Sequence, residues 1–361
     1  MKKNISLLIV LFSLSLFAQD KIHIHTVTPD NLVPGNPNST YIDHPDLNGN
    51  FSAKIVVKQS YSPNDVLNDH PINLFYFNNQ WTINNSDFAP LPIGASFNVF
   101  IGGSSTSIIY HQATGANSTS FATSIDDPLF NNQNPGPNAA FSHEYLPNAG
   151  VIAKPLGFDY TNGKRRIYAE DLDGFTTDTN FIIVVPSGND SFTHESTPQN
   201  IEGPYTTIDH PLLNDNPNVS FVFEHYYGLE GNLNDFDHNL GLSYVPSLGR
   251  WLIFAQDLAD FIPGLAFSIL TAPIDGTLSI DENNLASKII MHPNPVNNMT
   301  NISATEEIKN VSVLNMLGQE VLMLKGNSNT MQVNMEDLSA GTYFVKVQTH
   351  KGFQILKALK N

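Results

Sequence analysis

Short runs of Val, Ile, Phe and Tyr recur along most of the chain, with Asn, Gly and Pro standing between the runs. This pattern predicts β-strands joined by tight turns. In the first hundred residues we expect strands at 22–27, 53–60, 72–77, 80–86 and 95–101, with Asn78-Asn79 as a hairpin turn. Helical periodicity is absent throughout, so the chain is predicted to be all-β.

The pattern occurs three times in constant register. The clearest markers lie 83 residues apart, twice over: Ile42-Asp43-His44-Pro45, Ile125-Asp126-Asp127-Pro128 and Ile208-Asp209-His210-Pro211. An Ile–Asp pair follows in each copy, with Asp87, Asp171 and Asp257, and a Phe comes ten residues later, at Phe97, Phe181 and Phe267. We therefore predict three tandem antiparallel β repeats of about 80 residues, at 22–103, 107–188 and 190–273. Their short connections favour close packing, although beads on a string and a closed pseudo-threefold body both fit the spacing.

The two ends differ from the repeats. Lys2 and Lys3, the apolar run 5–17 and the exit Ala18-Gln19-Asp20 have the anatomy of a cleaved signal peptide, which we assign to residues 1–19. No later stretch reaches eighteen apolar residues, so no membrane span is expected in the mature protein. Residues 274–288 read as a linker, and 289–361 as a further small Ig-like β-sandwich.

Composition narrows the classes of function. The chain has no cysteine, which excludes a disulfide scaffold, a Cys nucleophile and a thiolate metal site. Of 17 basic and 34 acidic residues, 9 basic ones lie in the signal peptide and in 285–361, and 5 acidic ones in 285–361. Residues 20–284 therefore hold 8 basic and 29 acidic residues, a net charge of −21. This acidity argues against nucleic acid and anionic lipid as partners.

The repeats resemble a tandem domain of unknown function seen in secreted bacterial proteins. Two segments of the third copy carry the resemblance, namely Asp209 to Asn218 and Trp251 to Asp257. The second copy departs from the pattern, because Asp127 replaces the His and Arg165 stands where Trp81 and Trp251 stand. The resemblance covers roughly 25–272 and implies no activity.

The C-terminal segment resembles the type A sorting domain of the type IX secretion system. The resemblance rests on 289–298, 308–321 and 338–347, with the motif residues Pro293, Asn294, Pro295, Gly318, Gln319, Gly341, Tyr343 and Lys357. It implies the type IX machinery as partner and passage through the outer membrane of a member of the Bacteroidota. It also implies removal of the domain, followed by release or attachment at the cell surface.

Two sets of recurring Asp residues are candidates for ligand or cation loops. The first set is Asp43, Asp126 and Asp209, and the second is Asp87, Asp171 and Asp257. Oxygen-rich loops of this kind can bind Ca²⁺. The EF-hand spacing is missing, so we favour the alternative in which each Asp accepts backbone N–H bonds and fixes a turn.

Other candidates are aromatic and imidazole side chains. Trp81 and Trp251 could form a sugar-stacking platform, with core packing as the alternative. His25, His111 and His194 recur in all copies, which favours an architectural role over zinc. Zincin, Gly-x-Ser-x-Gly and phosphate-loop signatures are absent, whereas paired carboxylates of a glycosidase leave no such signature.

The sequence therefore favours a non-catalytic, secreted or cell-surface binding module, with a glycan or surface component as its ligand. One alternative is a secreted hydrolase or metalloenzyme with its site in one copy, for which Glu224, His225 and His238 are the first suspects. Another is a structural role in a surface layer.

Overall fold

The computed structural model describes residues 19–61, 64–188, 190–231, 233–275, 289–315, 320–349 and 352–361. Residues 1–18 of the predicted signal peptide and residues 276–288 of the predicted linker lie outside these ranges. The chain divides after residue 277 into two compact units, a repeat unit and a C-terminal unit. In the described parts of both, no helix is long and apolar enough to cross a membrane.

Each copy in the repeat unit contributes six principal strands. Copy 1 has β1 (Lys21–Thr26), β3 (Asn36–Ile42), β4 (Ile55–Ser60), β5 (Ile72–Phe77), β6 (Gln80–Asn85) and β7 (Ser96–Ile101). Copy 2 has β8 (Ser107–Gln112), β9 (Ala122–Ser124), β10 (Ala140–Glu144), β11 (Leu156–Thr161), β12 (Lys164–Ala169) and β13 (Asn180–Val185). Copy 3 has β14 (Ser191–Glu195), β16 (Tyr205–Ile208), β17 (Val219–His225), β18 (Leu240–Val245), β19 (Arg250–Ala255) and β20 (Ala266–Pro273). Short additions are β2 (Leu32–Val33), β15 (Ile201–Glu202) and the 3₁₀ turn η1 (Leu229–Gly231).

The six strands of a copy form two antiparallel three-stranded sheets. In copy 1 the inner sheet has the order β1-β7-β4 and the outer sheet the order β3-β6-β5. Copies 2 and 3 repeat both orders, with β8-β13-β10 and β9-β12-β11, then β14-β20-β17 and β16-β19-β18. The two sheets of each copy pack face to face, so that each copy is a small sandwich with its own core.

The all-β prediction is confirmed, and the five strands expected in the first copy all form. Asn78 and Asn79 have φ values of 50° and 67°, as a two-residue hairpin turn with both residues left-handed requires. The pattern did not reveal β3, because its first residues, Asn36-Pro37-Asn38-Ser39, are polar or turn-forming.

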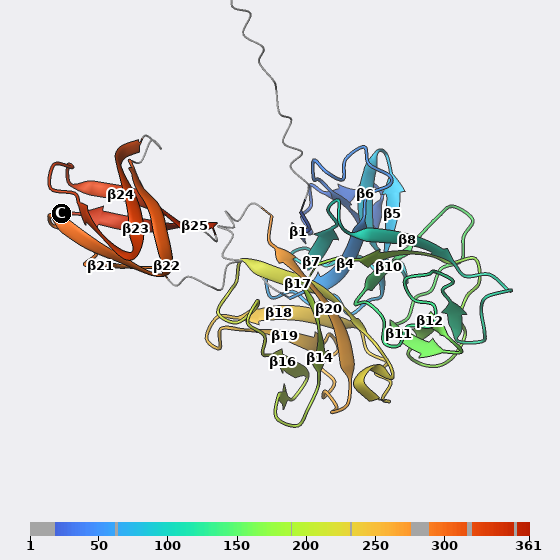
Figure 1. Ribbon diagram of the computed structural model, residues 1–361. Helices are drawn as coiled ribbons and strands as arrows, with labels where there is room; N and C mark the ends of the chain where they lie inside the picture. The colour runs from blue at the N-terminus through green and yellow to red at the C-terminus, as the bar shows by residue number, and fades with distance from the viewer. Residues whose placement is uncertain are drawn as a thin grey trace, which may run out of the picture. The chain divides into compact units, whose positions relative to one another are not determined.

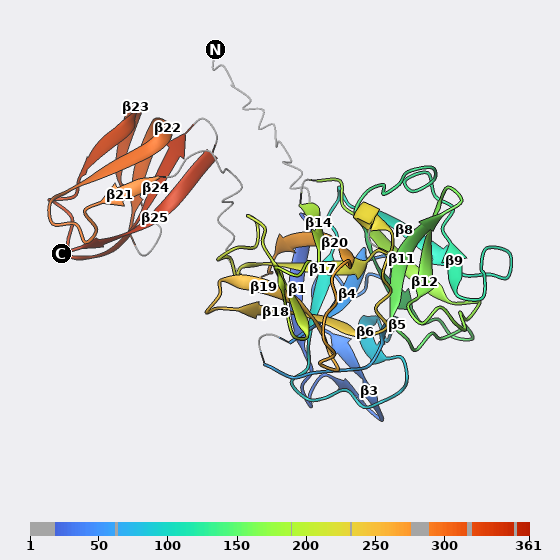
Figure 2. The ribbon, with the colours of Figure 1, turned by 90° about the horizontal axis from the view of Figure 1, so that it is seen from below.

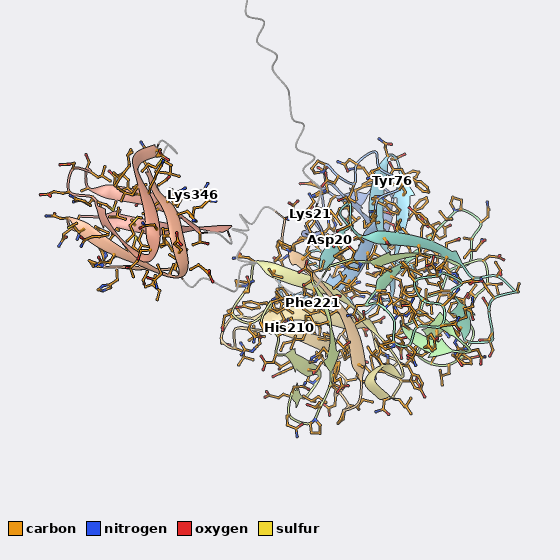
Figure 3. The ribbon with its side chains drawn as sticks, in the orientation of Figure 1. Asp20, Lys21, Tyr76, His210, Phe221 and Lys346 are labelled. Carbon is orange, nitrogen blue, oxygen red and sulfur yellow. The ribbon has the colours of Figure 1, made fainter. Side chains whose placement is uncertain are left out.

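The recurring apolar residues fill the sandwich cores. Ile83, Ile167 and Ile253 are completely buried, as are Phe97, Phe181 and Phe267. In copy 3, Phe221 packs edge-on against Trp251 at 5.7 Å between ring centroids, and Figure 3 labels Phe221 among the side chains of that copy. The spacing seen along the sequence thus records which positions face inward.

The three copies are closed into a ring by parallel strand pairing. The outer strand β5 of copy 1 pairs with β10 of copy 2, and β18 of copy 3 pairs with β4 of copy 1. A bridge between Phe158 of copy 2 and Tyr226 of copy 3 completes the circle. The same backbone bond marks all three junctions: Tyr145, Tyr227 and Tyr61 donate their N–H groups to Leu74, Phe158 and Leu242 at 2.7, 2.8 and 2.9 Å. The copies therefore form a closed pseudo-threefold body.

A separate apolar core lies where the inner sheets meet. It is built from equivalent positions of the copies, namely Ile22, Val56 and Phe100, then Ala140 and Val184, then Val222, Leu270 and Ala272. Figure 1 shows β4, β10 and β17 near the middle of the repeat unit, and Figures 1 and 2 show the hairpins β5–β6, β11–β12 and β18–β19 on three different sides. We call this meeting line of the inner sheets the axis.

The C-terminal unit is a five-stranded antiparallel structure with its own core. Its strands are β21 (Ile290–His292), β22 (Met299–Leu314), β23 (Glu320–Asn334), β24 (Gly341–Thr349) and β25 (Gly352–Lys360). The long β22 pairs with β21, β23 and β24, and register shifts after Ser303 and Ile308 interrupt its ladder with β23. Its inward residues, among them Val311, Val313, Val345 and Val347, are completely buried.

Candidate functional site

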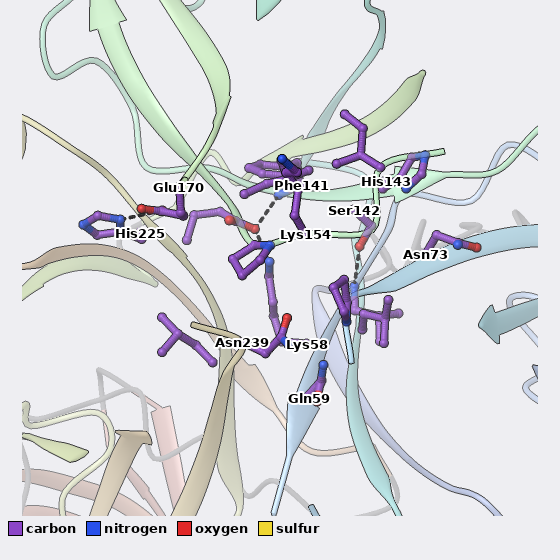
Figure 4. Close-up of a pocket in the computed structure, with 18 of the residues that line it drawn as sticks. Lys58, Gln59, Asn73, Phe141, Ser142, His143, Lys154, Glu170, His225 and Asn239 are labelled. Atoms are coloured by element: carbon purple, nitrogen blue, oxygen red, sulfur yellow. Dashed lines mark hydrogen bonds and ion pairs between the residues drawn. The ribbon is translucent and has the colours of Figure 1, made fainter. Parts of the chain in front are cut away.

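A cavity of about 110 Å³ lies at one end of the axis. Strand residues from all three copies line it, because β4, β10 and β17 converge there with the starts of β5, β11 and β18. Figure 4 shows the Lys58 side chain extending toward Phe141, and a dashed line joins Glu170 to His225 at one side. This axial cavity contains the ionisable groups that the sequence marked for an enzyme, namely Glu224, His225 and His238.

The central contact of the cavity is an ion pair between copies 1 and 3. Lys58 of β4 donates to a carboxylate oxygen of Glu224 on β17, which is only 2% exposed. The backbone N–H of Phe141 in copy 2 donates to the same oxygen at 3.3 Å. Burial raises the pKa of Glu224 to about 7, against the opposing pull of the Lys58 ammonium. All three copies therefore meet at one carboxylate.

The equivalent position in copy 2 makes the equivalent bond. Ser142 corresponds to Lys58 and Glu224, and its hydroxyl accepts from the N–H of Val57 in copy 1 at 2.9 Å. A carboxylate and a hydroxyl thus each accept one strand N–H of a neighbouring copy. An ammonium has no lone pair to accept such a bond, so Lys58 reaches the carboxylate instead.

A second polar contact repeats around the ring with different chemistry. Glu170 of copy 2 accepts from Nδ1 of His225 in copy 3 at 2.7 Å, and also from the Tyr168 hydroxyl at 2.8 Å. At the next junction, Gln256 of copy 3 donates to Gln59 of copy 1 at 2.7 Å.

At the third junction the partner position is Ser86, whose hydroxyl instead accepts from Asn73 at 3.0 Å. His143, which in copy 2 is the equivalent of His225, has no side-chain hydrogen-bond partner and packs against Phe181. Burial lowers the pKa of His143 to about 4, so this ring is neutral.

The three suspects of the enzyme alternative are thus each engaged. Glu224 pairs with Lys58, His225 with Glu170, and His238 with Asp257 at 2.7 Å. Two of these pairs join different copies, which indicates that the residues lining the axial cavity hold the three copies together.

The second set of recurring Asp residues caps turns in all copies. One carboxylate oxygen of Asp87, Asp171 or Asp257 accepts the N–H two residues later at 3.1 Å. The other oxygen pairs with His70, Lys154 or His238 in the same copy.

The first set fixes loops. Asn48, Asn131 and Asn214 donate to Asp43, Asp126 and Asp209 at 2.7, 2.8 and 2.6 Å. Calcium binding by these loops stays a prediction.

The departures of copy 2 preserve hydrogen-bonding roles. His44 and His210 accept the N–H two residues later through Nδ1, at 3.1 and 3.4 Å, and Asp127 accepts the same N–H through its carboxylate at 2.9 Å. Trp81 and Trp251 donate to the carbonyls of Asn50 and Asn216, and Arg165 donates to that of Pro137 at 2.9 Å.

The aromatic platform expected from Trp81 and Trp251 needs correction. The two residues are only 0% and 3% exposed, so their ring faces belong to the sandwich cores. Arg165, at the same position of copy 2, is also buried, and its guanidinium lies 4.3 Å from the centroid of Phe130. The strand pattern places these positions inward, which overrides the amphipathic character that suggested a sugar platform.

The histidines shared by all copies tie the two sheets of each sandwich. His25, His111 and His194 each bond through Nε2 to a threonine on the first outer-sheet strand of their copy, namely Thr40, Thr123 and Thr206, at 2.8–2.9 Å. Burial lowers the pKa of each of these histidines to about 4.

One group in the described part of the chain has the ligand spacing of a metal site. A ring nitrogen of His23, one of His44 and a carboxylate oxygen of Asp275 lie within 4.8 Å of one another. However, Nδ1 of His44 accepts the Asp46 N–H, so Nε2 must carry the ring proton, which it donates to Asp275 at 2.6 Å. A nitrogen that carries a proton offers no lone pair to a metal. The contact between His44 and Asp275 is therefore a hydrogen bond that joins copy 1 to the end of copy 3.

A second cavity, of about 250 Å³, lies on the outer face of copy 1. Its floor is a set of buried polar residues on β3, β5 and β6, namely Asn38, Ser39, Asn73, Thr82, Asn84 and Asn85. Its walls include Phe75, Phe77 and Phe88, together with Tyr145 and Val151 of copy 2. We call it the asparagine groove. The sequence did not reveal this groove. Its floor is formed by the side chains that alternate onto one face of β5 and β6, and one of its walls comes from another copy.

Comparison with protein families accounts for both units. A domain of unknown function, DUF7452, matches residues 10–101, 78–185 and 156–271, which together cover more than half of the chain. The chain belongs to the DUF7452 family. The second and third matches begin within the preceding copy, in or beside the hairpins whose outer strands pair with the next copy. The repeat boundaries drawn from the sequence stay predictions.

A secretion system C-terminal sorting domain matches residues 290–361, and no curated protein matches the chain. The resemblance to the type IX sorting domain is thereby confirmed. The chain is an exported protein, and the DUF7452 repeats are the part that the sorting domain directs to export. In the sorting domain, Asn294 donates to the carbonyl of Lys357 at 2.7 Å and accepts the N–H of Leu359 at 2.9 Å. Its flanking prolines, Pro293 and Pro295, therefore sit beside the last strand.

The motif residues Gly341 and Tyr343 lie in β24. The hydroxyl of Tyr343, two residues after Gly341, donates to the carbonyl of Ser339 at 2.9 Å. Gly318 and Gln319 lie outside the described residues, whereas the flanking strands β22 and β23 pair with each other.

The Lys58→Met variant should lose about 3–5 kcal/mol of unfolding free energy, because it leaves the Glu224 carboxylate buried without its counter-charge. Urea unfolding followed by fluorescence measures this loss. Replacing both residues, as Lys58→Met with Glu224→Leu, should restore much of it. The exposed Lys164–Asp126 pair serves as control, since Lys164→Met should change little. Equal effects of the two single variants would contradict a central role for the axial pair.

Acidification should destabilise the repeat unit between about pH 6.5 and pH 4. Four buried histidines, His25, His111, His143 and His194, have folded pKa values of about 4 against 6.5, so the unfolded chain binds more protons there. Each contributes up to about 1.4 kcal/mol per pH unit. The raised pKa values of Glu144 and Glu224, about 7, act oppositely, but these two large upward shifts are fewer than the four large downward shifts of the histidines.

Urea midpoints at pH 6.5, 5.5 and 4.5 check this dependence. The triple variant His25→Gln, His111→Gln and His194→Gln keeps a donor for each threonine and should flatten the profile. A wild-type midpoint that stays constant or rises on acidification would refute the assignment of neutral buried histidines.

Proposed function

We propose that the protein is a non-catalytic glycan-binding module, delivered to the extracellular side by its sorting domain, and that the asparagine groove is its binding site. The observation that carries the proposal is the lining of the groove, which combines amides and hydroxyls with aromatic rings and contains no ionisable acid, base or imidazole. Neutral sugars present hydroxyls at the ring edge and apolar C–H groups on the ring face. These two surfaces match amides and aromatic rings respectively.

The polar floor is held in place by its own hydrogen bonds. Asn84 donates to the side-chain oxygen of Asn73 at 3.0 Å, and Thr82 donates to the carbonyl of Phe75 at 3.0 Å. Beneath these residues, the side-chain amides of Asn85 and Asn68 form two hydrogen bonds with each other, at 2.9 and 3.1 Å. A fixed array of amides loses little conformational entropy on binding, which favours recognition of a hydroxyl-rich ligand.

The aromatic wall is partly open to solvent. Phe77 is 43% exposed and stacks on Phe75 at 5.8 Å between centroids, and Tyr145 of copy 2 meets Phe75 edge-on at 5.3 Å. The volume of about 250 Å³ lies just below the range of about 300–1,000 Å³ that suits drug-sized ligands. One or two sugar rings fit a cavity of this size.

The same positions in the other copies carry different chemistry. Where copy 1 pairs Phe75 with Thr82, copy 2 pairs Asp159 with Arg166, and copy 3 pairs Ser243 with Leu252. In copy 2 these two side chains form an ion pair, with Nε of Arg166 2.8 Å from Asp159. A neutral polar floor is therefore a property of copy 1, so repetition of the fold is compatible with a single specialised site.

Binding should depend on the exposed aromatic ring of the groove. In an array of neutral oligosaccharides followed by calorimetry, we expect Phe77→Ala to weaken the best ligand at least tenfold, because it removes a stacking face. Phe51→Ala is the matched control, since Phe51 is 55% exposed in the same copy but does not line the groove. No binding across the array, or equal losses in both variants, would reject the groove as a glycan site.

Export should require the sorting domain. Deletion of residues 289–361 removes a unit with its own core, so the repeat unit should still fold but stay in the periplasm of a type IX-competent bacterium. Cell fractionation and immunoblotting locate the protein. Unaltered secretion of the truncated chain would rule out this route, and surface labelling of the intact chain distinguishes attachment from release.

A further inference from the structure

Three exposed apolar residues occupy equivalent places in the ring. Phe88, Leu172 and Leu258 each directly follow one of the turn-capping Asp residues and are 71%, 50% and 59% exposed. Their φ values are 66°, 57° and 63°, which is the left-handed region. We call these residues the knobs. A bulky residue in this conformation is an outlier, since glycine or asparagine adopts it at lower cost.

Each knob is fixed in its turn from three directions. The N–H of the knob donates to the carbonyl three residues earlier, at 3.1, 2.9 and 3.0 Å. The preceding Asp accepts the N–H of the residue after the knob, and its second oxygen pairs with His70, Lys154 or His238. The turn is therefore over-determined, which is the condition under which a strained residue persists.

The knob side chains return little to the fold. Half of Leu172 and more than half of Phe88 and Leu258 is exposed to solvent, so burial of these side chains offsets little of the cost of the left-handed backbone. Strain that stability does not repay, held at the same place in all three copies, points to a contact made outside the molecule.

The asparagine groove indicates what that contact is. Phe88 itself lines the groove, together with Tyr145 of the next copy. The corresponding tyrosines at the other two junctions are Tyr227 and Tyr61. Each contacts an aromatic ring of an outer sheet: Tyr227 lies 6.2 Å from Tyr168 and Tyr61 lies 5.8 Å from Phe254, between ring centroids. Leu172 and Leu258 hold the same place in the repeat at those junctions.

We infer that the ligand is a neutral polysaccharide, whose chain occupies the asparagine groove and continues onto the knobs Leu172 and Leu258. This inference rests on the proposed function. A short sugar can reach one knob, whereas a polymer can contact several at once, so only a polymer makes use of all three. A neutral chain is also not repelled by a repeat region that carries a net charge of −21. The apolar C–H faces of successive sugar rings supply the surface that the leucines contact.

The test compares a polymer with its own fragment. Xylan, linear α-1,4-glucan, β-1,3-glucan and β-mannan are run with the full chain in affinity electrophoresis, and their trisaccharides are titrated by calorimetry. The variant combines Leu172→Asn with Leu258→Asn, which keeps a residue suited to the left-handed region but removes both apolar side chains. We expect polymer affinity to fall at least tenfold and trisaccharide affinity to change less than twofold. The melting temperature should stay the same or rise, because strain is released.

Leu248→Asn is the matched control, since Leu248 is 53% exposed at the turn between β18 and β19, away from the knob end of β19. It should leave both affinities unchanged. Undiminished polymer binding by the double variant, with trisaccharide binding intact, would overturn the role of the knobs while the proposed function stands. If the wild-type chain binds neither probe, the proposed function fails and this inference fails with it.

Discussion

Unpaired sheet edges are the constraint on which this structure depends. Each copy consists of two three-stranded sheets, and every such sheet exposes rows of free backbone groups at its edges. The inner edge strands β4, β10 and β17 accept the outer edge strands β18, β5 and β11 of the preceding copies, so that one copy completes the sheet of another. Because three copies close the circle, no copy is left with this pair of edges uncovered.

Closure brings the inner sheets together, and the remaining interactions follow from it. Apolar residues of all copies form the axial core, and at its end the Lys58–Glu224 pair and the Glu170–His225 contact join copies through buried polar groups. Such groups are costly unless satisfied, so they specify one arrangement of the copies more than they add to its stability. The three junctions share a backbone bond but differ in side chains, as Glu170, Gln256 and Ser86 show.

This difference explains how a repeated fold acquires a particular site. The backbone geometry of the outer sheet is common to the copies, whereas its outward residues are free to vary because they do not pack in a core. In copy 1 they form a neutral floor under aromatic walls, and in copy 2 they form an ion pair. The knobs follow the opposite rule, since their position and backbone strain are common to all copies. A specialised groove and a repeated contact thus coexist on one scaffold.

Much of the architecture could be predicted from the sequence by itself. Short runs of Val, Ile, Phe and Tyr bounded by turn residues identified the strands, the constant spacing of Asp87, Asp171 and Asp257 identified three copies, and the tail identified the export route. These properties are local, because side-chain alternation and turn chemistry act within a few residues. The architectural role of His25, His111 and His194 also followed from repetition alone.

Only the tertiary structure decided the rest. The direction of ring closure, the burial of Trp81 and Trp251, the meeting of Lys58 with Glu224 and the asparagine groove all depend on segments far apart in the chain. Single-sequence patterns carry no information on which strand edges find each other, and an amphipathic Trp looks alike in a core and on a sugar platform. The strained backbone of Phe88, Leu172 and Leu258 was equally hidden, since nothing in the letters Asp-Phe or Asp-Leu indicates a left-handed residue until the surrounding turn imposes it.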